Sequence, residues 1–564
     1  MTETKLGINF FKDKDVILNY GKSTMKNDNL LFVILLMLFS LLPTLLYSQV
    51  DTAWVRRYNG SGNSTDEANA IAVDGLGNVY VAGYSWGLTT NTDFTTIKYY
   101  TNGNTAWIRR YDGSGLEDMV HAITVDDSGN VYVTGHSYGS VTYLDYATIK
   151  YRANGDTAWI RRYNGPVTGE DIAYAVAVDN AENVYVTGSS FGSGTNRDYM
   201  TIKYNSAGVQ QWVQRYNGPG NSEDRAYAIA VDGSGNAYVT GRSSGTSYDY
   251  ATVKYNSAGV EQWAQRYNGS GNGWDEAYAI AIDGSGNVYV TGYSYGAGAN
   301  NDYLTIKYNS AGVQQWVQRY NGSGDAEDRA CGIAVDGSGN IYVTGYSYGF
   351  GTHLDYAIIK YNSAGAQQWV QRYNGPGNAA DQAYAIALDS AGNVYVTGFD
   401  AGSISDYDYA TIKYNTLGVE QWVQRYAGPG SSINYAYALA IDRQANVYVT
   451  GRSDGPGTSA DYATIKYVQT QGIEENHQPL SADRLSLEVY PNPARSYFTI
   501  RLPKTANRIK IYDITGKAVK EIGDCFALAR NDNAVRIPLN GIKNGIYFVK
   551  ADNFNQVIKL IVTK

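Results

Sequence analysis

Cysteine and histidine are scarce in this chain of 564 residues. The two cysteines, Cys331 and Cys525, are far apart in the sequence, which excludes a disulfide framework. The four histidines do not form a pair at a zinc-type spacing, and no cysteine cluster adds ligands. They are His121, His136, His353 and His477. We therefore expect no cofactor, and a Ca²⁺ site has no support in the sequence.

The chain also contains few charged residues and few prolines. Charged residues make up 17% of the chain, below the roughly 25% that is usual. No convincing amphipathic helix follows residue 50, whereas Gly (62) and Tyr (53) are abundant, a composition typical of short strands and tight turns. The net charge is −8, and because the last segment, 486–564, is basic, the central body is strongly acidic. An acidic body argues against nucleic acid as a partner.

One long apolar run is present near the N-terminus, over residues 30–46. Lys26 precedes it and Ser48 follows it, as in a secretory signal with a cleavage site, and Met25 is then the expected start. We interpret 1–48 as the signal peptide region and expect no stable membrane span after cleavage. A retained signal anchor is the alternative. Residues 1–24 have no assigned role.

A repeat dominates the rest of the chain. Eight tryptophans recur at intervals of 51 to 53 residues: Trp54, Trp107, Trp159, Trp212, Trp263, Trp316, Trp369 and Trp422. Each begins a version of WVQRYNG, which is followed by AYAIAVDGSGNVYVTG and then by DYATIKYNSAG. A fixed period of this length indicates a repeat architecture.

Each repeat predicts four strands. AYAIAVD, NVYVTG, DYATIKY and QQWVQRY alternate side-chain types with period two, and we name them A, B, C and D. The links DGSGN and NSAG are short and suit tight hairpins, whereas the B–C and D–A links are longer. Four-stranded units in a radial array form a β-propeller. Strand A is expected innermost because Ala226, Ala228 and Ala230 are small.

The order of the strands supplies a way to close the ring. The repeats start with a lone D strand at Trp54 and end with an A-B-C set between Tyr435 and Tyr467. The first strand can therefore complete the last blade and remove the open edge. We predict an all-β chain with an eight-bladed propeller over 51–468.

The repeat resembles the bacterial beta-propeller repeat family. The matching residues are DGSGNVYVTGYS, then DYATIKYNSAG, then the Trp strand, over residues 51–468. The resemblance implies a propeller fold and no single activity. The family is sometimes described as seven-bladed, whereas this chain has eight units. Two arrangements therefore stay open: an eight-bladed ring and a less regular closure.

The recurrent DGSGN stretch poses a choice between a turn and a metal loop. An EF-hand loop needs a Glu at its end, which is absent, and the eighth unit keeps the length as DRQAN without its Gly and Ser. We interpret the stretch as a hairpin turn. The Asp residues that open strand C, those that precede strand A, and the Arg of strand D recur in the same way and are interpreted as scaffold. A ring of Asp that binds a cation is the alternative.

Function is expected where the blades differ. The long B–C and D–A links share one face of a propeller, and loops on a rigid scaffold commonly bind ligands. Aromatic and basic residues interspersed with Ser and Asn suit sugars or peptides, although they can also pack the loops together. The candidates are Tyr84, Trp86, His136, Tyr138, Phe191, Arg242, Trp274, Tyr293, Tyr295, Tyr346, Tyr348, Phe399 and Arg452.

A polar linker, 469–485, leads to a compositionally distinct segment, 486–564, that alternates as a small β-sandwich. This segment resembles the C-terminal sorting domain (type A) of the type IX secretion system. The matching pieces, in order, are Tyr490-Pro491-Asn492-Pro493, Tyr512-Asp513, Thr515-Gly516-Lys517, Gly545-Ile546-Tyr547 and Lys559-Leu560-Ile561-Val562. The resemblance implies export through the periplasm to the cell surface or medium, with the secretion machinery as a partner.

Three functions stay open at this stage. The first is a non-catalytic module that binds an extracellular glycan, peptide or other surface component. The second is a secreted hydrolase or lyase with its site at the mouth of the propeller channel, and the third is a structural spacer. The chain offers no evident nucleophile–base pair, only irregularities at His121 and His136 in the second unit and at Asp325 and Glu327 in the sixth.

Overall fold

The computed structural model describes residues 49–139, 142–296, 300–403, 406–430, 433–470, 488–490, 497–501, 509–513, 517–522, 534–551 and 557–562. The signal region 1–48 and most of the linker lie outside the described residues. The chain divides into two compact units, residues 1–472 and 473–564. Among the described residues no helix is long and apolar enough to cross a membrane.

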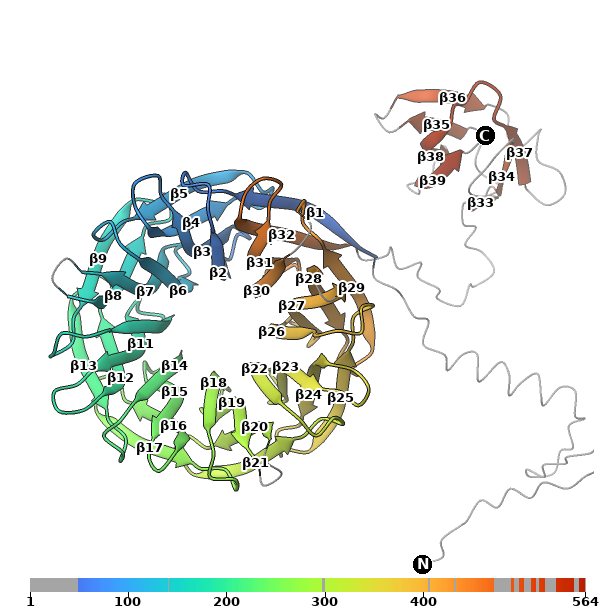
Figure 1. Ribbon diagram of the computed structural model, residues 1–564. Coiled ribbons are helices and arrows are strands. Elements are labelled where there is room, and N and C mark those ends of the chain that lie inside the picture. The colour runs from blue at the N-terminus through green and yellow to red at the C-terminus, as the bar shows by residue number, and fades with distance from the viewer. Residues whose placement is uncertain are drawn as a thin grey trace, which may run out of the picture. The chain divides into compact units, whose positions relative to one another are not determined.

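The first unit is a ring of eight four-stranded antiparallel sheets (Figure 1). The inner strands are β2 (Glu67–Val73), β6 (Asp118–Val125), β10 (Ile172–Val178), β14 (Asp224–Val231), β18 (Asp275–Ile282), β22 (Asp328–Val335), β26 (Gln382–Leu388) and β30 (Asn434–Ile441). The second strands are β3 (Val79–Trp86), β7 (Val131–Tyr138), β11 (Val184–Phe191), β15 (Ala237–Ser244), β19 (Val288–Tyr295), β23 (Ile341–Tyr348), β27 (Val394–Ser403) and β31 (Val447–Asp454).

The outer half of each blade completes the sheet. The third strands are β4 (Thr92–Tyr99), β8 (Leu144–Tyr151), β12 (Arg197–Tyr204), β16 (Tyr248–Tyr255), β20 (Asn301–Tyr308), β24 (Leu354–Tyr361), β28 (Asp406–Tyr414) and β32 (Ala460–Thr470). The outer strands are β5 (Thr105–Tyr111), β9 (Thr157–Tyr163), β13 (Gln210–Tyr216), β17 (Glu261–Tyr267), β21 (Gln314–Tyr320), β25 (Gln367–Tyr373), β29 (Glu420–Tyr426) and β1 (Gln49–Tyr58). The predicted eight-bladed propeller, with strand A innermost, is confirmed.

The ring closes through β1, as the strand order predicts. β1 pairs antiparallel with β32, and the register places Trp54 opposite Lys466 and Tyr58 opposite Tyr462. Arg57 in β1 donates to Asp461 at 2.8 Å, so the added strand makes the same ion pair as an outer strand elsewhere in the ring. Closure joins the N-terminal strand to the last blade, so that this blade has four strands like the other seven.

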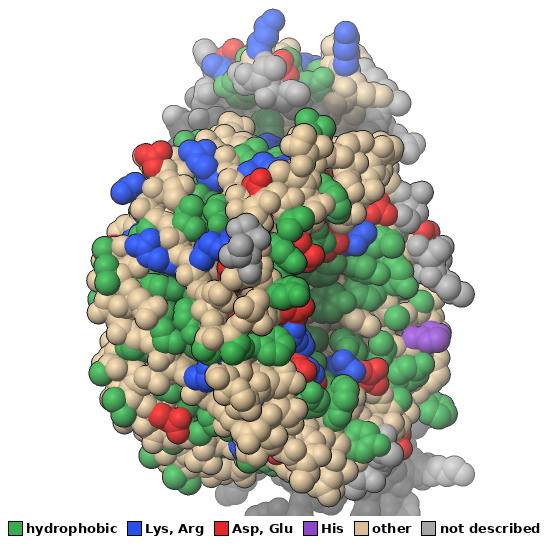
Figure 2. All heavy atoms as spheres, turned by 60° about the vertical axis from the view of Figure 1, so that its left-hand side comes forward, with side chains coloured by type: hydrophobic (Ala, Val, Ile, Leu, Met, Phe, Trp, Pro, Cys, Tyr) green, Lys and Arg blue, Asp and Glu red, His purple; other side chains and the backbone are tan. Residues whose placement is uncertain are grey.

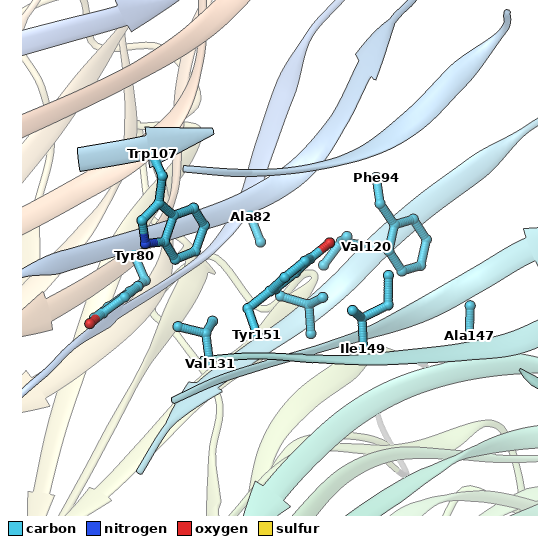
Figure 3. Packing of buried hydrophobic residues seen from close by; sticks show 10 residues of the cluster. Tyr80, Ala82, Phe94, Trp107, Val120, Val131, Ala147, Ile149 and Tyr151 are labelled. Carbon is cyan, nitrogen blue, oxygen red and sulfur yellow. The ribbon is translucent and has the colours of Figure 1, made fainter. Parts of the chain in front are cut away.

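Aromatic side chains fill the space between neighbouring blades. Between blades 1 and 2, Tyr80, Trp107 and Tyr151 pack with aliphatic residues such as Val131 and Ile149 (Figure 3). The indole of Trp107 also donates to the carbonyl of Ala153 in the next blade, at 3.3 Å. The wide outer gap between blades therefore takes a large side chain, whereas the narrow inner region takes alanine.

The DGSGN stretch forms a turn in which the Asp carboxylate accepts four hydrogen bonds. Asp283 accepts hydrogen bonds from the backbone of Ser285 and Asn287, from the Asn287 side chain and from the Tyr289 hydroxyl, at 2.7 to 2.9 Å. Gly286 has a φ of 75°, which this turn requires and glycine adopts without strain. Burial would raise the pKa of Asp283, but the hydrogen bonds from Asn287 outweigh it and lower that pKa.

Each blade also carries one partly buried ion pair between its third and outer strands. The nitrogen–oxygen distances lie between 2.6 and 3.2 Å in all eight blades. The pairs are Arg57–Asp461, Arg110–Asp93, Arg162–Asp145, Arg215–Asp198, Arg266–Asp249, Arg319–Asp302, Arg372–Asp355 and Arg425–Asp408. Since the arrangement repeats in every blade, it is part of the scaffold.

The second unit contains two sheets. One has the order β33 (Glu488–Tyr490), β34 (Tyr497–Arg501), β37 (Ala534–Pro538). The other has the order β36 (Ala518–Ile522), β35 (Ile509–Asp513), β38 (Gly545–Ala551), β39 (Val557–Val562). Ile511, Ile537, Val549 and Leu560 are buried, so both sheets contribute apolar side chains to the interior of this small domain. Pro491–Pro493, Thr515 and Gly516 lie outside the described residues.

Candidate functional site

The blades differ most at one cross-strand pair near the axis, between the inner and second strands. In blade 5 this pair is Glu276 and Tyr293. The pairs in chain order are Glu67–Tyr84, Met119–His136, Ile172–Ser189, Arg225–Arg242, Glu276–Tyr293, Arg329–Tyr346, Gln382–Phe399 and Tyr435–Arg452. We call these the mouth pairs, since they lie at the end of the inner strands that faces the long links.

The positions beside the mouth pairs scarcely vary. In blade 5 the preceding residue of the second strand is Gly292, and a Cβ there would stand 1.9 Å from the carbonyl oxygen of Glu276, so the close strand approach requires glycine. The following residue, Ser294, is fully buried and serves the scaffold ion pair by accepting from Arg319 at 2.7 Å. The variable pair is therefore presented by a rigid and repeated frame.

Beside each mouth pair, one residue of the inner strand forms a β-bulge that the sequence pattern did not predict. In chain order these residues are Asn69, His121, Tyr174, Tyr227, Tyr278, Cys331, Tyr384 and Tyr437. Their rings meet from blade to blade, with centroid distances of 5.6 Å for Tyr174–Tyr227 and 5.5 Å for Tyr227–Tyr278. The bulge residues thus form an aromatic belt around the axis, interrupted at Asn69 and Cys331.

An ionic network occupies the mouth in blades 3 to 5. Arg242 donates to Glu276 at 2.6 Å and to Glu223 at 3.1 Å, and its guanidinium lies 4.3 Å from the ring centroid of Tyr248. Burial would lower the pKa of Arg242, but Tyr227 and Glu276 raise it. Burial would likewise raise the pKa of Glu223, yet the neighbouring arginines lower it. Both groups are therefore charged at neutral pH.

Blades 7 and 8 give the mouth a different character. Phe399 lies 4.6 Å from Tyr435 and 5.1 Å from Tyr407, measured between ring centroids. Tyr407 belongs to β28, which with β27 forms a longer hairpin than the second and third strands of the other blades. The mouth thus combines an ionic sector with an aromatic sector. Figure 2 shows a hollow near the middle of the ring with hydrophobic side chains and charges of both signs around it.

Blade 2 places two histidines together. His121 Nε2 lies 2.9 Å from His136 Nδ1, and His136 Nε2 lies 3.5 Å from Glu117 Oε1. Burial, with a smaller contribution from His136, lowers the pKa of His121 to about 3. His121 is accordingly neutral under physiological conditions.

The structure places the predicted ligand-face residues in two groups and leaves Trp274 outside both. Seven belong to mouth pairs: Tyr84, His136, Arg242, Tyr293, Tyr346, Phe399 and Arg452. Five lie further from the axis and touch neighbouring link residues: Trp86, Tyr138, Phe191, Tyr295 and Tyr348. Trp274 stands apart, because 55% of its surface is exposed while its ring meets the edge of Tyr248.

Sequence reasoning missed the inner-strand members of the mouth pairs and the bulge residues other than His121. A column-by-column comparison of the eight repeats could have found them, because these two columns vary while the residues around them recur. The sequence also does not indicate that Tyr293 and Phe399 are almost fully buried.

Other features of the described residues are weaker candidates. A groove of about 600 Å³ lies between the short turns of blades 4 and 5, but its carboxylates, Asp232 and Asp283, already accept hydrogen bonds within their own turns. Asp93, Asp112 and Asp118 lie close enough to share a cation, yet Asp93 pairs with Arg110.

These features define a class: a β-propeller with a repeated frame and a variable channel mouth. The sequence profile of the family described as Beta-propeller repeat matches seven segments, namely residues 53–88, 106–141, 211–249, 262–298, 315–351, 368–398 and 421–457. The unmatched unit is the one that begins at Trp159. The profile described as Secretion system C-terminal sorting domain matches residues 488–563. The chain is therefore a beta-propeller repeat protein with a type IX sorting domain.

More distant similarities were also found. A curated relative, the uncharacterized WD repeat-containing protein L264 of Acanthamoeba polyphaga mimivirus, is 22% identical over 435 residues, which are 54% of this chain and 31% of that protein. The chain thus spans about a third of that relative's length. PorZ, a surface component of the type-IX secretion system of Porphyromonas gingivalis, is 15% identical with a TM-score of 0.39, covering 86% of this chain and 64% of PorZ.

A periplasmic gluconolactonase of Pseudomonas aeruginosa, PpgL, is 11% identical with a TM-score of 0.40, covering 64% of this chain and 98% of that one. These likenesses are too distant to add to the assignment, which rests on the sheet topology and the two family matches. The sorting domain means that the protein is exported by type IX secretion to the cell surface or the extracellular space.

Proposed function

We propose that the propeller is a non-catalytic binding module that holds a glycan, a peptide or another surface component at its channel mouth. The observation that carries this proposal is the variation at the mouth pairs, the bulge residues and the long links, which stand at one end of a frame that is otherwise largely repeated. The packing of the blades does not dictate these residues, because the backbone register around them is the same in every blade.

The chemistry of the mouth suits a ligand with both polar groups and flat apolar faces. Arg242 and Glu223 offer planar, charged hydrogen-bonding groups, and Tyr435 and Trp274 offer aromatic surface. Aromatic rings stack on the apolar faces of sugars or grip peptide side chains, while charged planar groups orient hydroxyls and amides. Both signs of charge are present, which supports a neutral or zwitterionic ligand over a strongly charged one.

A hydrolase or lyase is the second candidate, and the Glu117–His136–His121 series is the observation in its favour. An enzyme would also need a nucleophile or an activated water near that series. The irregularities of the sixth unit do not supply one, because Asp325 accepts from Asn321 and Glu327 pairs with Arg329. A structural spacer is the third candidate and is distinguished by the absence of any ligand.

A screen of the full mature chain against glycans and peptides tests the binding proposal. Tyr346→Ser and Trp274→Glu introduce residues that other blades carry at the equivalent positions, so the frame should tolerate them. Each is expected to weaken binding of a hit by about tenfold, as loss of one aromatic contact at a binding hot spot does. Val260→Ser, on the opposite face, is the control. Equal affinity for all variants would refute the mouth as the site.

Export has a separate test. Deletion of 486–564 removes the sorting domain, and the truncated protein is expected to accumulate in the periplasm. Fractionation and surface labelling of intact cells measure the outcome. Normal surface display of the truncated chain would contradict a sorting role for this domain, and a variant lacking the propeller but retaining 469–564 serves as the matched control.

A further inference from the structure

We propose that His121 and His136 form a binding site for a borderline divalent cation such as Zn²⁺ or Cu²⁺ in the channel wall of blade 2. Imidazole nitrogens are suitable ligands for both ions. His121 is the bulge residue of β6 and His136 belongs to the mouth pair of the adjacent strand β7, so the backbone itself brings the two rings together.

The nitrogen atoms are close to the separation that one ion requires. His121 Nε2 and His136 Nδ1 are 2.9 Å apart. Zinc–nitrogen bonds of about 2.0–2.1 Å at a tetrahedral angle separate two ligand nitrogens by roughly 3.3 Å. A small rotation of either ring would therefore admit the ion between them, and the hydrogen-bonded pair is the ion-free form of the site.

Glu117 occupies the place of an outer-shell carboxylate. Its Oε1 atom lies 3.5 Å from Nε2 of His136, the ring nitrogen that does not contact His121. This nitrogen is buried and has no hydrogen-bond partner. A carboxylate in this position fixes the proton on Nε2 and leaves Nδ1 with its lone pair free for the metal. Half of the Glu117 side chain is exposed, so it can move the short distance needed to accept that hydrogen bond.

The frame does not explain the two histidines. Equivalent bulge and mouth residues in blade 3 are Tyr174 and Ser189, and in blade 5 they are Tyr278 and Tyr293, with the same backbone register. Two of the four histidines in the chain meet at positions where structure alone accepts many residue types. Water or an oxygen atom of a bound ligand would complete the coordination, since two protein ligands leave the ion open.

Calorimetric titration of the full, untagged and chelator-treated chain with Zn²⁺ tests the proposal. One equivalent is expected to bind, and Cu²⁺ in its place is expected to give an electron paramagnetic resonance spectrum with imidazole nitrogen couplings. His121→Tyr with His136→Ser, which copies blade 3, should abolish this binding, and Glu117→Gln should weaken it by about 10–100-fold. His353→Asn, at an exposed site, is the control.

A transfer experiment makes the test stricter. Tyr174→His, Ser189→His and Arg197→Leu copy blade 2 into blade 3. Glu170 stands at the position of Glu117, and Arg197, which pairs with it, has Leu144 as its counterpart in blade 2. A second equivalent of Zn²⁺ is expected. Zinc uptake that is unchanged in the blade 2 double variant, or a Cu²⁺ spectrum without imidazole couplings in the wild-type chain, would overturn the proposal. If the double variant fails to fold, a wild-type spectrum without imidazole couplings still overturns the proposal, and couplings that persist in His353→Asn support it.

Discussion

Removal of β1 is expected to open the propeller ring and to lower its free energy of unfolding by about 5 kcal/mol or more. The deletion of 49–58 takes away Trp54, which is 8% exposed, and leaves Asp461, which is 5% exposed, without Arg57. Truncation of a buried tryptophan costs about 3–5 kcal/mol. Loss of Arg57 leaves the Asp461 carboxylate unpaired, which costs less than the about 3–5 kcal/mol of a fully buried pair because Arg57 is partly exposed. The two effects are coupled, so their sum is an upper limit.

The deletion also leaves β32 without a hydrogen-bonded neighbour along the edge that pairs with residues 49–58 in the intact chain. Unlike the outer strands, β32 is buried in the intact ring, with Tyr462, Ile465 and Tyr467 almost fully covered. Its newly exposed edge and side chains would recruit other strands, so the truncated chain is expected to self-associate. Urea denaturation measures the stability and light scattering measures the association. A permuted chain that carries residues 49–58 after β32, joined by the Asn-Ser-Ala-Gly turn of other blades, should recover both properties. A truncated chain as stable and monomeric as the wild type would contradict closure through β1.

The architecture could be predicted because two independent periods agree. The recurrence of Trp marks each unit, and alternation of side chains with period two marks each strand within it. The lone strand at Trp54 then determines how the ring closes, since a sheet of three strands beside a free fourth strand has one satisfactory arrangement. A comparison between repeats also identifies the DGSGN stretch as a turn, because the eighth unit lacks its Gly and Ser and still keeps its length.

The site was less predictable because a bulge breaks the alternation on which the prediction depended. In AYAIAVD, period two places Tyr227 on the same face as Ile229. Ile229 does pack against the core between blades, but the register shift at Tyr227 directs that ring toward Tyr174 and Tyr278 instead. Contacts between blades, such as Arg242 with Glu276, were equally inaccessible, because they depend on the spacing of two sheets and not on either strand.

Replacement of Asp400 by Ser is expected to stabilise the protein at pH 8 by about 2 kcal/mol and to change little at pH 5. Seven blades carry Ser at this position, whereas blade 7 places Asp400 beside Asp381, and both side chains are fully buried. Burial, opposed by hydrogen bonds from Gly375 and Ala401 and reinforced by the charge of Asp400, raises the pKa of Asp381 from 3.8 to about 7.

The sign follows from which state holds the proton. Because the pKa of Asp381 is higher in the folded state, the folded protein keeps a proton that the unfolded chain releases above pH 3.8. The stability that this proton confers is complete below that pH and is lost as the pH rises through about 7. Without Asp400 the two carboxylates no longer repel, and Arg425 retains Asp408 as a partner, at 3.2 Å.

Urea denaturation at pH 5 and pH 8 measures the effect. The wild-type chain should lose stability between these values, and Asp400→Ser should reduce that loss, while burial of Asp381 maintains the rest. Ser347→Asp is the matched control, because it installs the carboxylate pair beside Asp328 in blade 6 and should steepen the loss. A variant Asp400→Ser that is less stable than the wild type at pH 8 would show instead that the bonds from Tyr373 and Arg425 to Asp400 outweigh the repulsion.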